Sequence, residues 1–474
     1  MKGKLVASVE EAIRLCGLKD GMTVSFHHHL RDGDGVLPMV MNKISEMGFH
    51  DITVSASGIH GSHGCLVDLI KNGVVTGIDT DYISKVVGLS ISHGSMDRPV
   101  IFRTHGNRPH AIAVGESPID IAFIAASAAD CQGNMNGVSG PSAFGSMGYA
   151  FADAAYAKKV VVITDNLVEY PLTPISIDER YADYVVAVDS IGDVNGIRSG
   201  ITAVTQNPMS LEIAKKAVSV FENSGLFEEG FIYQTGGGSI SLATTKFLQA
   251  AMDRKGIRGS AILGGTNGLL VDLLEKGYFR KIMDIQCLDL DAVESIKRNQ
   301  EHQEISAACY ADMLSKSCVA KHLTCVMLGA TEIDLDFNVN VHTDSNGIIR
   351  GGSGGHTDIA HGAKLTIAMA PLLRQRRSAV LEHVTTKSTL GDSIDVFVTQ
   401  RGIAVNPKRP DLRSRLVDAG LPVKEIGELY ETARALAGKP DPLPFTDKVV
   451  GKVYGYDGQL SDVIRQVDES KAAV

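Results

Sequence analysis

The 474-residue chain predicts an α/β fold built from two homologous halves, each with a mostly parallel sheet. Short and mainly apolar runs, such as residues 119–127, alternate with helical patterns, as in parallel strands covered on both faces. Glycine-rich turns follow several of these runs. A chain of this length also exceeds one ordinary hydrophobic core, so two domains are expected.

An internal repeat divides the chain into the two halves. The string LVDLIKNG at residues 66–73 recurs as LVDLLEKG at residues 270–277, a shift of 204 residues (270 minus 66). The pattern D-x-x-x-N-x-N recurs with the same shift. We therefore predict one domain at residues 1–205 and a second at residues 206–440. The tail, residues 441–474, is expected to form a strand and a short helix.

Each half is predicted to run through the same order of elements. A helix leads into a strand that ends in a turn of unusual composition. After this turn come a helix, a second strand, a glycine turn and the LVDL helix. Ligands of parallel sheets bind beyond the carboxyl ends of the strands, where these turns lie. The predicted equivalents are the helices at 9–16 and 211–222, and the strands at 22–26 and 230–234 and at 52–57 and 260–263.

Composition excludes several classes of function. A net charge of −9 argues against nucleic acid or an anionic membrane as the main partner. The first residues predict an amphipathic helix and not a signal peptide, and no apolar run reaches the length of a membrane span. Seven cysteines without a C-x-x-C pair indicate reduced thiols. We expect a cytoplasmic protein.

The turn GGSGGHTD, which begins at Gly351, is the most distinctive glycine cluster. Four glycines around Ser353 remove nearly every Cβ atom, so backbone amides can approach a bound group closely. Such a turn can direct N–H donors at an oxyanion, a phosphate or a thioester carbonyl. A flexible loop without a ligand is the alternative interpretation.

The segment HHHLRDGDG, residues 27–35, forms a second candidate site. Strand alternation would place His27 and His29 on one face and His28 on the other. With Arg31, these side chains could bind a polycarboxylate, which is the interpretation we favour. A metal site that also uses the histidines of GIHGSHG, or histidines that only pack the turn, are the alternatives. No acidic or cysteine partner lies at a recognisable ligand spacing, so no metal ligand is predicted.

Two further glycine turns, TGGGS and GGTNG, connect strands to helices in the second half. The amides at a helix N-terminus could bind a phosphate or a pantetheine chain there. A tight turn between strand and helix that binds no ligand is the alternative interpretation. Neither turn matches a dinucleotide or P-loop motif. The candidate residues for binding the acyl thioester are Gly236, Gly237, Gly238, Gly264, Gly265, Thr266 and Ser353.

The repeated D-x-x-x-N-x-N pattern places Asn side chains beside small-residue turns in both halves. Amides at these positions could hold a carboxylate or an acyl carbonyl. Asp and Asn also form turns and caps without any ligand, which is the alternative. The candidate substrate-binding residues here are Asn134, Asn136, Asn338 and Asn340, and His356 is added from the Gly351 turn.

Four strings, SFHHHLRDGDGVLP, ITDNLVEYPLTPISI, ILGGTNGLLVDLLEKG and GGSGGHTDIAHGAKLTIAMAPLL, together resemble the alpha-subunit family of bacterial citrate lyase. The resemblance covers essentially the whole chain. It implies the CoA-transferase fold and a citrate:acetyl-carrier-protein transferase in citrate fermentation. It implies as partners citrate, a beta subunit and a gamma subunit that is the acyl carrier, within a hetero-oligomer that also contains copies of this chain.

The resemblance also implies that the chain holds no cofactor of its own. It would act on the CoA-derived prosthetic group of the carrier, for which acetyl-CoA is a surrogate. Many CoA-transferases form a thioester on a Glu in an S-E-N-G turn, but the equivalent position here reads Gly264–Gly268 without a carboxylate. We therefore expect a citrate carboxylate to attack the acetyl thioester directly, through a mixed anhydride.

The superfamily's acyl-CoA site lies at the turn that matches GGSGGHTD. The residues carried over as catalytic donors are Gly351, Gly352, Gly354, Gly355 and Asn267. Two alternatives stay open: a general acyl-CoA:carboxylate CoA-transferase, and a non-catalytic subunit that docks the carrier. Their fold would be the same, so the fold alone does not decide between them.

Overall fold

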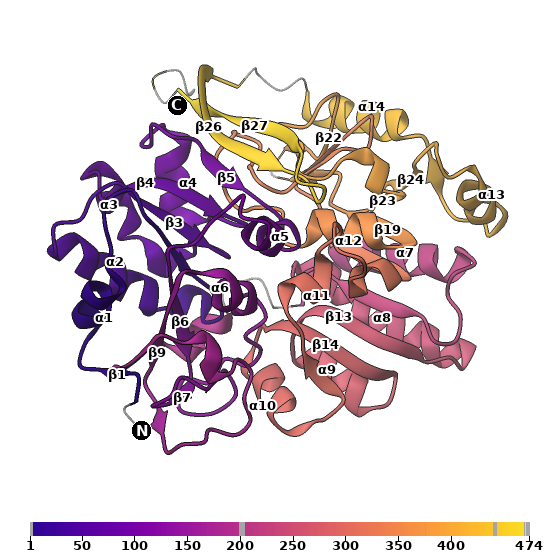
Figure 1. The fold of residues 1–474 in the computed structure, drawn as a ribbon. Coiled ribbons are helices and arrows are strands. Elements are labelled where there is room, and N and C mark those ends of the chain that lie inside the picture. The colour runs from indigo at the N-terminus through magenta and orange to yellow at the C-terminus, as the bar shows by residue number, and fades with distance from the viewer. Residues whose placement is uncertain (1–2, 199–203, 375, 439–442, 469, 471–474) are drawn as a thin grey trace.

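The structure is a computed structural model that describes residues 3–198, 204–374, 376–438, 443–468 and 470. Within these residues the chain forms a ten-stranded sheet and a nine-stranded sheet, with three small sheets of two or three strands. Figure 1 shows the two large sheets in separate halves of the molecule, with helices around each. The predicted α/β class with mostly parallel sheets is confirmed.

The first large sheet is parallel except for its last pair of strands. Its spatial order is β1 (Leu5–Val6), β11 (Tyr184–Ala187), β9 (Lys159–Thr164), β6 (Ile121–Ala126), β2 (Thr23–Phe26), β3 (Ile52–Ala56), β4 (Val75–Thr80), β5 (Val100–Phe102), β26 (Phe445–Tyr454) and β27 (Leu460–Val467).

The second large sheet is parallel except where β23 meets β24. Its spatial order is β15 (His302–Glu304), β14 (Phe279–Cys287), β13 (Gly259–Thr266), β12 (Ile232–Thr235), β16 (Cys325–Gly329), β19 (Leu365–Met369), β23 (Val396–Thr399), β24 (Gly402–Val405) and β25 (Val423–Lys424).

The two sheets share one topology. In each, four consecutive strands lie side by side (β2 to β5 and β12 to β15), and the next three extend the other edge in the same order. Two small sheets also correspond: β10 (Leu167–Val168), β7 (Ala128–Asp130) and β8 (Met135–Asn136) in one half, and β22 (Val380–Leu381), β17 (Glu332–Asp334) and β18 (Val339–Asn340) in the other. β20 (Leu373–Arg374) and β21 (Arg377–Ser378) pair separately. The predicted boundary at residues 205 and 206 stays a prediction, and that at residues 440 and 441 lies outside the described residues.

Helices cover both faces of each sheet, and one set in each half faces the other half. The first half contains α1 (Val9–Cys16), α2 (Val36–Glu46), α3 (Leu66–Lys71), α4 (Lys85–Ser92), α5 (Asn107–Ala113) and α6 (Ala150–Tyr156). The second contains α7 (Pro208–Asn223), α8 (Ser239–Lys255), α9 (Gly268–Glu275), α10 (Leu290–Arg298), α11 (Ala307–Ala311), α12 (His356–Gly362), α13 (Pro410–Asp418) and α14 (Ile426–Ala437). In Figure 1, α5 and α6 face α11 across the middle of the molecule, where they pack together.

Local sequence explains where the predicted helices begin and end. Ser8 accepts a hydrogen bond from the Glu11 amide and so caps α1, which ends at Gly17 in the left-handed conformation. Asn207 caps α7 ahead of a proline in the first turn, so this helix begins before the predicted residue 211. The fully buried β6 explains why its predicted run is apolar throughout.

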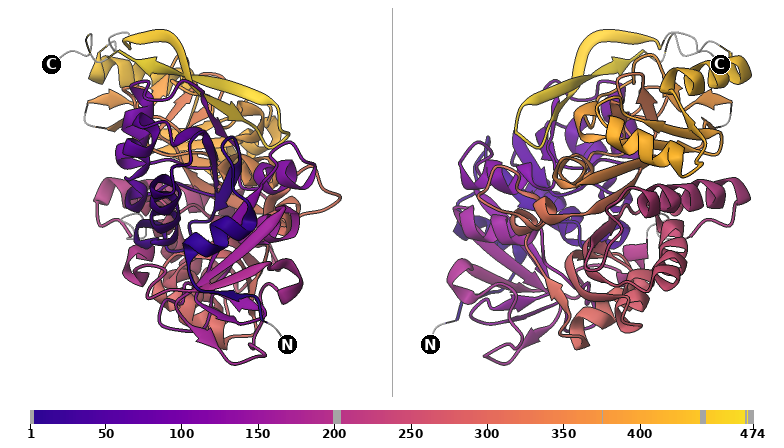
Figure 2. Two further views of the ribbon diagram at one scale, coloured as in Figure 1. Left: turned by 60° about the vertical axis from the view of Figure 1, so that its left-hand side comes forward. Right: turned by 90° about the vertical axis from the view of Figure 1, so that its right-hand side faces the viewer.

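The tail differs from the prediction in its second element. Residues 460–467 form the strand β27 and not a short helix, because they pair antiparallel with β26. β26 in turn pairs with β5, so the hairpin extends the first sheet although it follows the second in sequence. Figure 2 shows this yellow hairpin at one end of the molecule.

None of the described helices is long and apolar enough to cross a membrane. Each of the seven cysteines is a free thiol, and three of them are buried.

Candidate functional site

The glycine turn at Gly351 lies at the contact between the two halves. The Gly354 carbonyl accepts a hydrogen bond from the His105 amide of the first half at 2.9 Å. A Cβ atom on Gly352 would lie 2.0 Å from the Asp81 carbonyl oxygen, so no side chain fits there. Gly354 adopts a φ of +50°, which favours glycine. The glycines therefore serve a close backbone contact, which disfavours the interpretation as a flexible loop.

The protein uses only some of the amides in this turn. The Gly351 and Gly354 amides donate to backbone carbonyls at 3.2 and 3.4 Å. Among the described residues, no group accepts a hydrogen bond from the amides of Gly352, Ser353 or Gly355. These three neighbouring donors could hold an oxyanion or a carbonyl oxygen. Two of the four predicted glycine donors, Gly351 and Gly354, are already occupied.

The polar residues after the turn have structural roles. Asp358 accepts hydrogen bonds from the Thr104 hydroxyl at 2.6 Å and the Gly106 amide at 2.9 Å, and so joins α12 to the first half. The His356 ring contacts the Thr389 hydroxyl at 2.8 Å and the Gly329 carbonyl at 3.2 Å. Burial lowers the pKa of His356 to about 4, so it is neutral at pH 7. Both ring nitrogens have contacts within the protein, and the assignment of His356 to the substrate-binding set stays a prediction.

The TGGGS turn ends β12 and opens α8 without a capping side chain. The Gly236 amide donates to a neighbouring strand, while the buried Ser241 hydroxyl on α8 has no hydrogen-bond partner within the described ranges. Ideal Cβ atoms on Gly236 and Gly238 would lie 3.6 and 3.8 Å from this hydroxyl oxygen. The turn therefore places the unpaired Ser241 hydroxyl beside the uncapped amides at the start of α8. Together these donors could bind a polar or anionic group.

The GGTNG turn follows β13, where a register shift between Gly264 and Gly265 interrupts the pairing with β14. Asn267 caps α9 by accepting from the Leu270 amide at 3.2 Å. The Thr266 hydroxyl is fully buried and has no hydrogen-bond partner among the described residues. As predicted, this turn carries no carboxylate, and Thr266 instead has a hydroxyl that is free to bind a ligand. The Asn267 side chain has at least one structural role, as the cap of α9.

The histidines of HHHLRDGDG follow β2 and alternate as expected. The rings of His27 and His29 contact each other through their Nδ1 atoms, and His28 instead contacts the Ser57 hydroxyl at 2.8 Å. The Nε2 atoms of His27 and His29 are buried and find no hydrogen-bond partner in the described part of the chain. Burial lowers the pKa of His27 to about 4 and that of His29 well below its usual value. These rings are therefore neutral at pH 7. Because one Nδ1 atom donates to the other, only one of the two Nε2 atoms carries a proton, so the pair offers one hydrogen-bond donor and no cation.

Arg31 is the cation of this turn, and it has no counter-ion. Its side chain is buried, yet within the described parts of the chain it makes no ion pair and no hydrogen bond. The adjacent carboxylate of Asp32 pairs instead with Lys85 at 2.7 Å and accepts from the Gly61 amide at 2.8 Å. Burial lowers the pKa of Arg31. Arg31 also has a φ of 53°, a strained conformation that clusters at functional sites.

A hydrogen-bonded chain against His28 and His29 was not predicted from the sequence. Asp81 Oδ2 contacts His105 Nδ1 at 2.7 Å, and His105 Nε2 contacts the Tyr149 hydroxyl at 2.9 Å. His105 lies against the Gly351 turn, since a Cβ atom on Gly354 would be 3.2 Å from its Nε2. The three residues lie in different loops of the first half and share no motif.

The four Asn residues of the repeated pattern have structural roles in both halves. The Asn134 and Asn338 side chains donate to Asp130 and Asp334 of the same pattern, at 2.8 and 3.1 Å. Their side-chain oxygens accept backbone amides from distant loops. Asn136 and Asn340 likewise bond to nearby backbone groups. The turn-forming interpretation explains these contacts, while the assignment of the four residues to the substrate-binding set stays a prediction.

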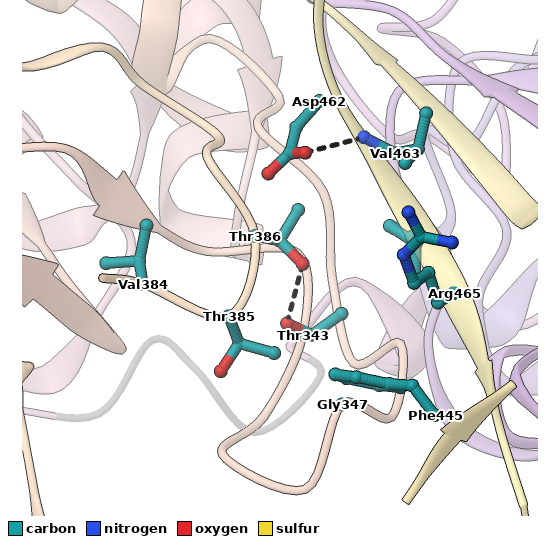
Figure 3. A pocket seen from close by; sticks show the side chains of 10 residues that line it. Thr343, Gly347, Val384, Thr385, Thr386, Phe445, Asp462, Val463 and Arg465 are labelled. Atoms are coloured by element: carbon teal, nitrogen blue, oxygen red, sulfur yellow. Dashed lines mark hydrogen bonds between the residues drawn. The ribbon is translucent and has the colours of Figure 1, made fainter. Parts of the chain in front are cut away.

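Two other features lie away from the predicted site. A pocket of about 270 Å³ separates the β26–β27 hairpin from loops of the second half, with Arg465 and Thr386 on its wall (Figure 3). Within the described ranges, one group of metal-ligating side chains brings its atoms within 4.8 Å of one another: Asp284, Cys287 and His302. Asp284 Oδ2 contacts both partners at 3.1 Å, so hydrogen bonds already satisfy this buried group.

Comparisons with known proteins identify close relatives. A family model described as "Citrate lyase, alpha subunit (CitF)" matches residues 2–467. The citrate lyase alpha chain of Klebsiella pneumoniae is 49% identical over 467 residues, which cover 98% of this chain and 92% of that protein. The Escherichia coli counterpart is 47% identical over 466 residues, which cover 98% and 91%.

Solved structures agree with the sequence comparisons. A crystal structure described as the alpha subunit of citrate lyase in complex with citrate, from Streptococcus mutans, superposes with a TM-score of 0.97 and 47% identity over 98% of this chain and 92% of that one. A 4-hydroxybutyrate CoA-transferase from Porphyromonas gingivalis, 16% identical, has a TM-score of 0.59 over 91% and 97% of the two chains. The latter likeness shows that the predicted CoA-transferase fold is present.

Proposed function

The chain belongs to the citrate lyase alpha-subunit family, and from this premise we propose that it is the citrate:acetyl-carrier-protein transferase of a citrate lyase complex. The reaction exchanges acetate for citrate on a carrier thioester, which gives citryl-carrier and acetate. The partners are a gamma subunit, whose CoA-derived prosthetic group carries the acyl chain, and a beta subunit that cleaves the citryl thioester. The complex also contains further copies of this chain and works in the cytoplasm.

The observation that carries this proposal is the buried and unpaired Arg31. A cation that is removed from water without a counter-ion destabilises the citrate-free protein, because its hydration is lost and no ion pair replaces it. A citrate carboxylate would supply the missing charge and accept two parallel hydrogen bonds from the guanidinium. The neutral pair of His27 and His29 adds one Nε2–H donor without adding charge.

The second half provides the groups for the thioester. The free amides of Gly352, Ser353 and Gly355 would hold the oxygen that becomes negative when a citrate carboxylate attacks the acetyl carbon. The thiolate leaves, and it then attacks the citryl carbonyl of the mixed anhydride to release acetate. Thr266 carries no carboxylate and its hydroxyl is unpaired, so it can donate to the attacking citrate carboxylate but offers no acyl acceptor.

The carrier's arm would approach along the carboxyl edge of the second sheet. The turn of Gly236, Gly237 and Gly238 lets a chain pass close to the backbone, and the unpaired Ser241 hydroxyl offers a donor beside it. Gly264 and Gly265 lie at the end of the adjacent strand β13. These assignments extend the predicted acyl-thioester set by one residue, Ser241.

A single assay separates this function from its alternatives. The purified chain is incubated with labelled citrate and with either acetyl-CoA or the acetyl-loaded carrier, and the products are identified by mass spectrometry. Citryl thioester is the expected product. Preferential transfer to simple acids such as acetate or hydroxybutyrate would indicate a general CoA-transferase. Carrier binding without any transfer would indicate a docking subunit.

Direct attack makes a separate prediction about the protein itself. After incubation with acetyl-CoA alone, treatment with borohydride or hydroxylamine should leave every Asp and Glu side chain unmodified, as judged by peptide mass spectrometry. A trapped glutamyl or aspartyl adduct would overturn the direct mechanism while leaving the overall reaction unchanged.

A further inference from the structure

The hydrogen-bonded chain Asp81–His105–Tyr149 contacts the histidine turn at one end and the glycine turn at His105. Tyr149 is buried, and its ring packs on His28 and His105 with centroids 4.6 and 4.7 Å away. The Tyr149 ring also packs on His29, with centroids 5.5 Å apart, so Tyr149 lies against the histidine turn that contains Arg31.

The titratable protons of this hydrogen-bonded chain of three side chains can be counted. An ionised Asp81, a neutral His105 and Tyr149 together hold two protons, and two hydrogen bonds join them. His105 Nδ1–H then donates to Asp81, and the Tyr149 hydroxyl donates to His105 Nε2. In this state Tyr149 presents only oxygen lone pairs to its surroundings, which repel a carboxylate.

One additional proton, held by Asp81, reverses both hydrogen bonds. A protonated Asp81 donates to His105 Nδ1, the ring then carries its one proton on Nε2, and Nε2–H donates to the Tyr149 oxygen, so the Tyr149 hydroxyl is released to donate elsewhere. Burial raises the pKa of Asp81, which favours its protonated form. The Tyr149 oxygen also lies 3.5 Å from Gln286 Oε1, which can accept from this hydroxyl in the citrate-free protein. Burial also keeps the pKa of Tyr149 well above its usual value, so the hydroxyl stays protonated.

We propose that Asp81, His105 and Tyr149 form a relay that takes up one proton when citrate binds, and that the released Tyr149 hydroxyl donates to a citrate carboxylate beside Arg31. Asp81 and His105 are positioning residues, and Tyr149 contacts the substrate. No covalent bond changes in this step, and the proton returns to solvent when the product leaves. The inference rests on the proposed use of citrate and adds the residues that make its binding depend on pH.

Other charged groups near the relay do not provide the extra proton. Asp81 is influenced by Asp79 and Arg108, which are held in the ion pairs Asp79–Arg103 and Asp153–Arg108. His28 faces His105, but burial lowers the pKa of His28 well below its usual value. Arg31, Tyr310 and Asp284 act electrostatically on Tyr149, and Asp358 and Asp81 influence each other. Asp284 and Asp358 are already hydrogen-bonded, so Asp81 is the group of this hydrogen-bonded chain that can hold the extra proton.

The test measures proton uptake on citrate binding by isothermal titration calorimetry in two buffers of different ionisation enthalpy. Tyr149→Phe and His105→Gln are compared with the wild-type chain. We expect both variants to take up close to one proton fewer per citrate. Tyr149→Phe should also weaken citrate binding about tenfold to a hundredfold, as expected for the loss of a hydrogen bond to a charged group. The KM for acetyl-CoA should not change.

His110→Gln is the matched control. His110 lies on α5, close to His105 in sequence, and its Nδ1 also contacts a carboxylate, Asp312, at 3.2 Å. This control should bind citrate and protons as the wild-type chain does. If Tyr149→Phe and His105→Gln, folded by circular dichroism, show the same proton uptake as His110→Gln, the relay is refuted. If the wild-type chain itself does not bind citrate, the proposed function fails as well.

Discussion

Arg31 leads to an unusual prediction about stability. Replacing Arg31 by Met removes a buried charge and keeps a long apolar side chain. The effective penalty for burying an unpaired ion is several kcal/mol. The variant regains only part of this free energy, because it loses some packing of the arginine side chain and keeps the strained backbone. We therefore expect the free energy of unfolding of the citrate-free protein to rise by about 1–3 kcal/mol. Citrate should no longer stabilise this variant.

A second buried arginine provides the control. Arg103 is 8% exposed, as is Arg31, but its Nε atom pairs with Asp79 Oδ2 at 2.9 Å. Arg103→Met leaves the Asp79 carboxylate without its cation, and breaking a buried pair in this way lowers stability by about 3–5 kcal/mol. The two variants remove the same group from equally buried positions and differ in whether that group has a carboxylate partner. They should therefore change the free energy of unfolding in opposite directions.

The assay is denaturant unfolding with and without citrate. At a citrate concentration of a hundred times Kd, the wild-type chain should gain about 2.7 kcal/mol, and Arg31→Met should gain nothing. If Arg31→Met destabilises the protein as much as Arg103→Met does, Arg31 has a partner in the folded protein and the reasoning is wrong. Equal stabilisation of both chains by citrate would also refute the assignment.

Three further predictions test other parts of the site. Gly352→Ala places a Cβ atom 2.0 Å from a backbone oxygen and should lower stability by several kcal/mol in denaturant unfolding, whereas Gly427→Ala, where nothing lies within 4 Å, should raise it by about 0.5–1 kcal/mol. Thr266→Val removes a hydroxyl that has no partner, so stability should hold or rise while the KM for citrate increases; an unchanged KM would exclude Thr266 from the site. The pKa of His356, about 4 in the folded state, lies below its unfolded value, so its contribution is complete above pH 6.5 and is lost as pH falls toward 4. His356→Gln should therefore reduce the loss of stability in this window by up to about 1.4 kcal/mol per pH unit, and an unchanged pH dependence would contradict the burial argument.

The duplicated architecture could be predicted because repeats and periodicity are properties of contiguous sequence. The LVDL helices α3 and α9 and the strands before them lie where the repeat placed them. The Gly351 turn could be identified because four glycines in five residues have few structural explanations. The β27 strand was missed because its pairing depends on β26, and the position of β26 is set by β5 in the distant first half.

Other site residues could not be predicted because their roles depend on tertiary contacts. Asparagine is a residue type that often binds ligands, so the sequence alone suggests that role for Asn134 and Asn338. Only the structure shows that their side chains already form hydrogen bonds within the protein. Asp81, His105 and Tyr149 are scattered in sequence and belong to no motif. Arg31 was predicted from its neighbours, but its lack of a counter-ion follows from the position of Lys85, which pairs with the adjacent carboxylate.

The proposed site also explains why the two halves are joined so closely. The cation and the relay come from the first half, whereas the free amides and the Thr266 hydroxyl come from the second, so neither half alone contains a complete site. The backbone contact of Gly352 with Asp81, and the hydrogen bonds of Asp358 to residues 104 and 106, fix the turn against the same loops that hold the relay. A shift of this contact would move the oxyanion donors relative to the carboxylate that attacks, and such misplacement of reacting groups slows reactions steeply. Substitutions at the contact should therefore lower kcat even where the KM values for citrate and the acetyl donor are preserved.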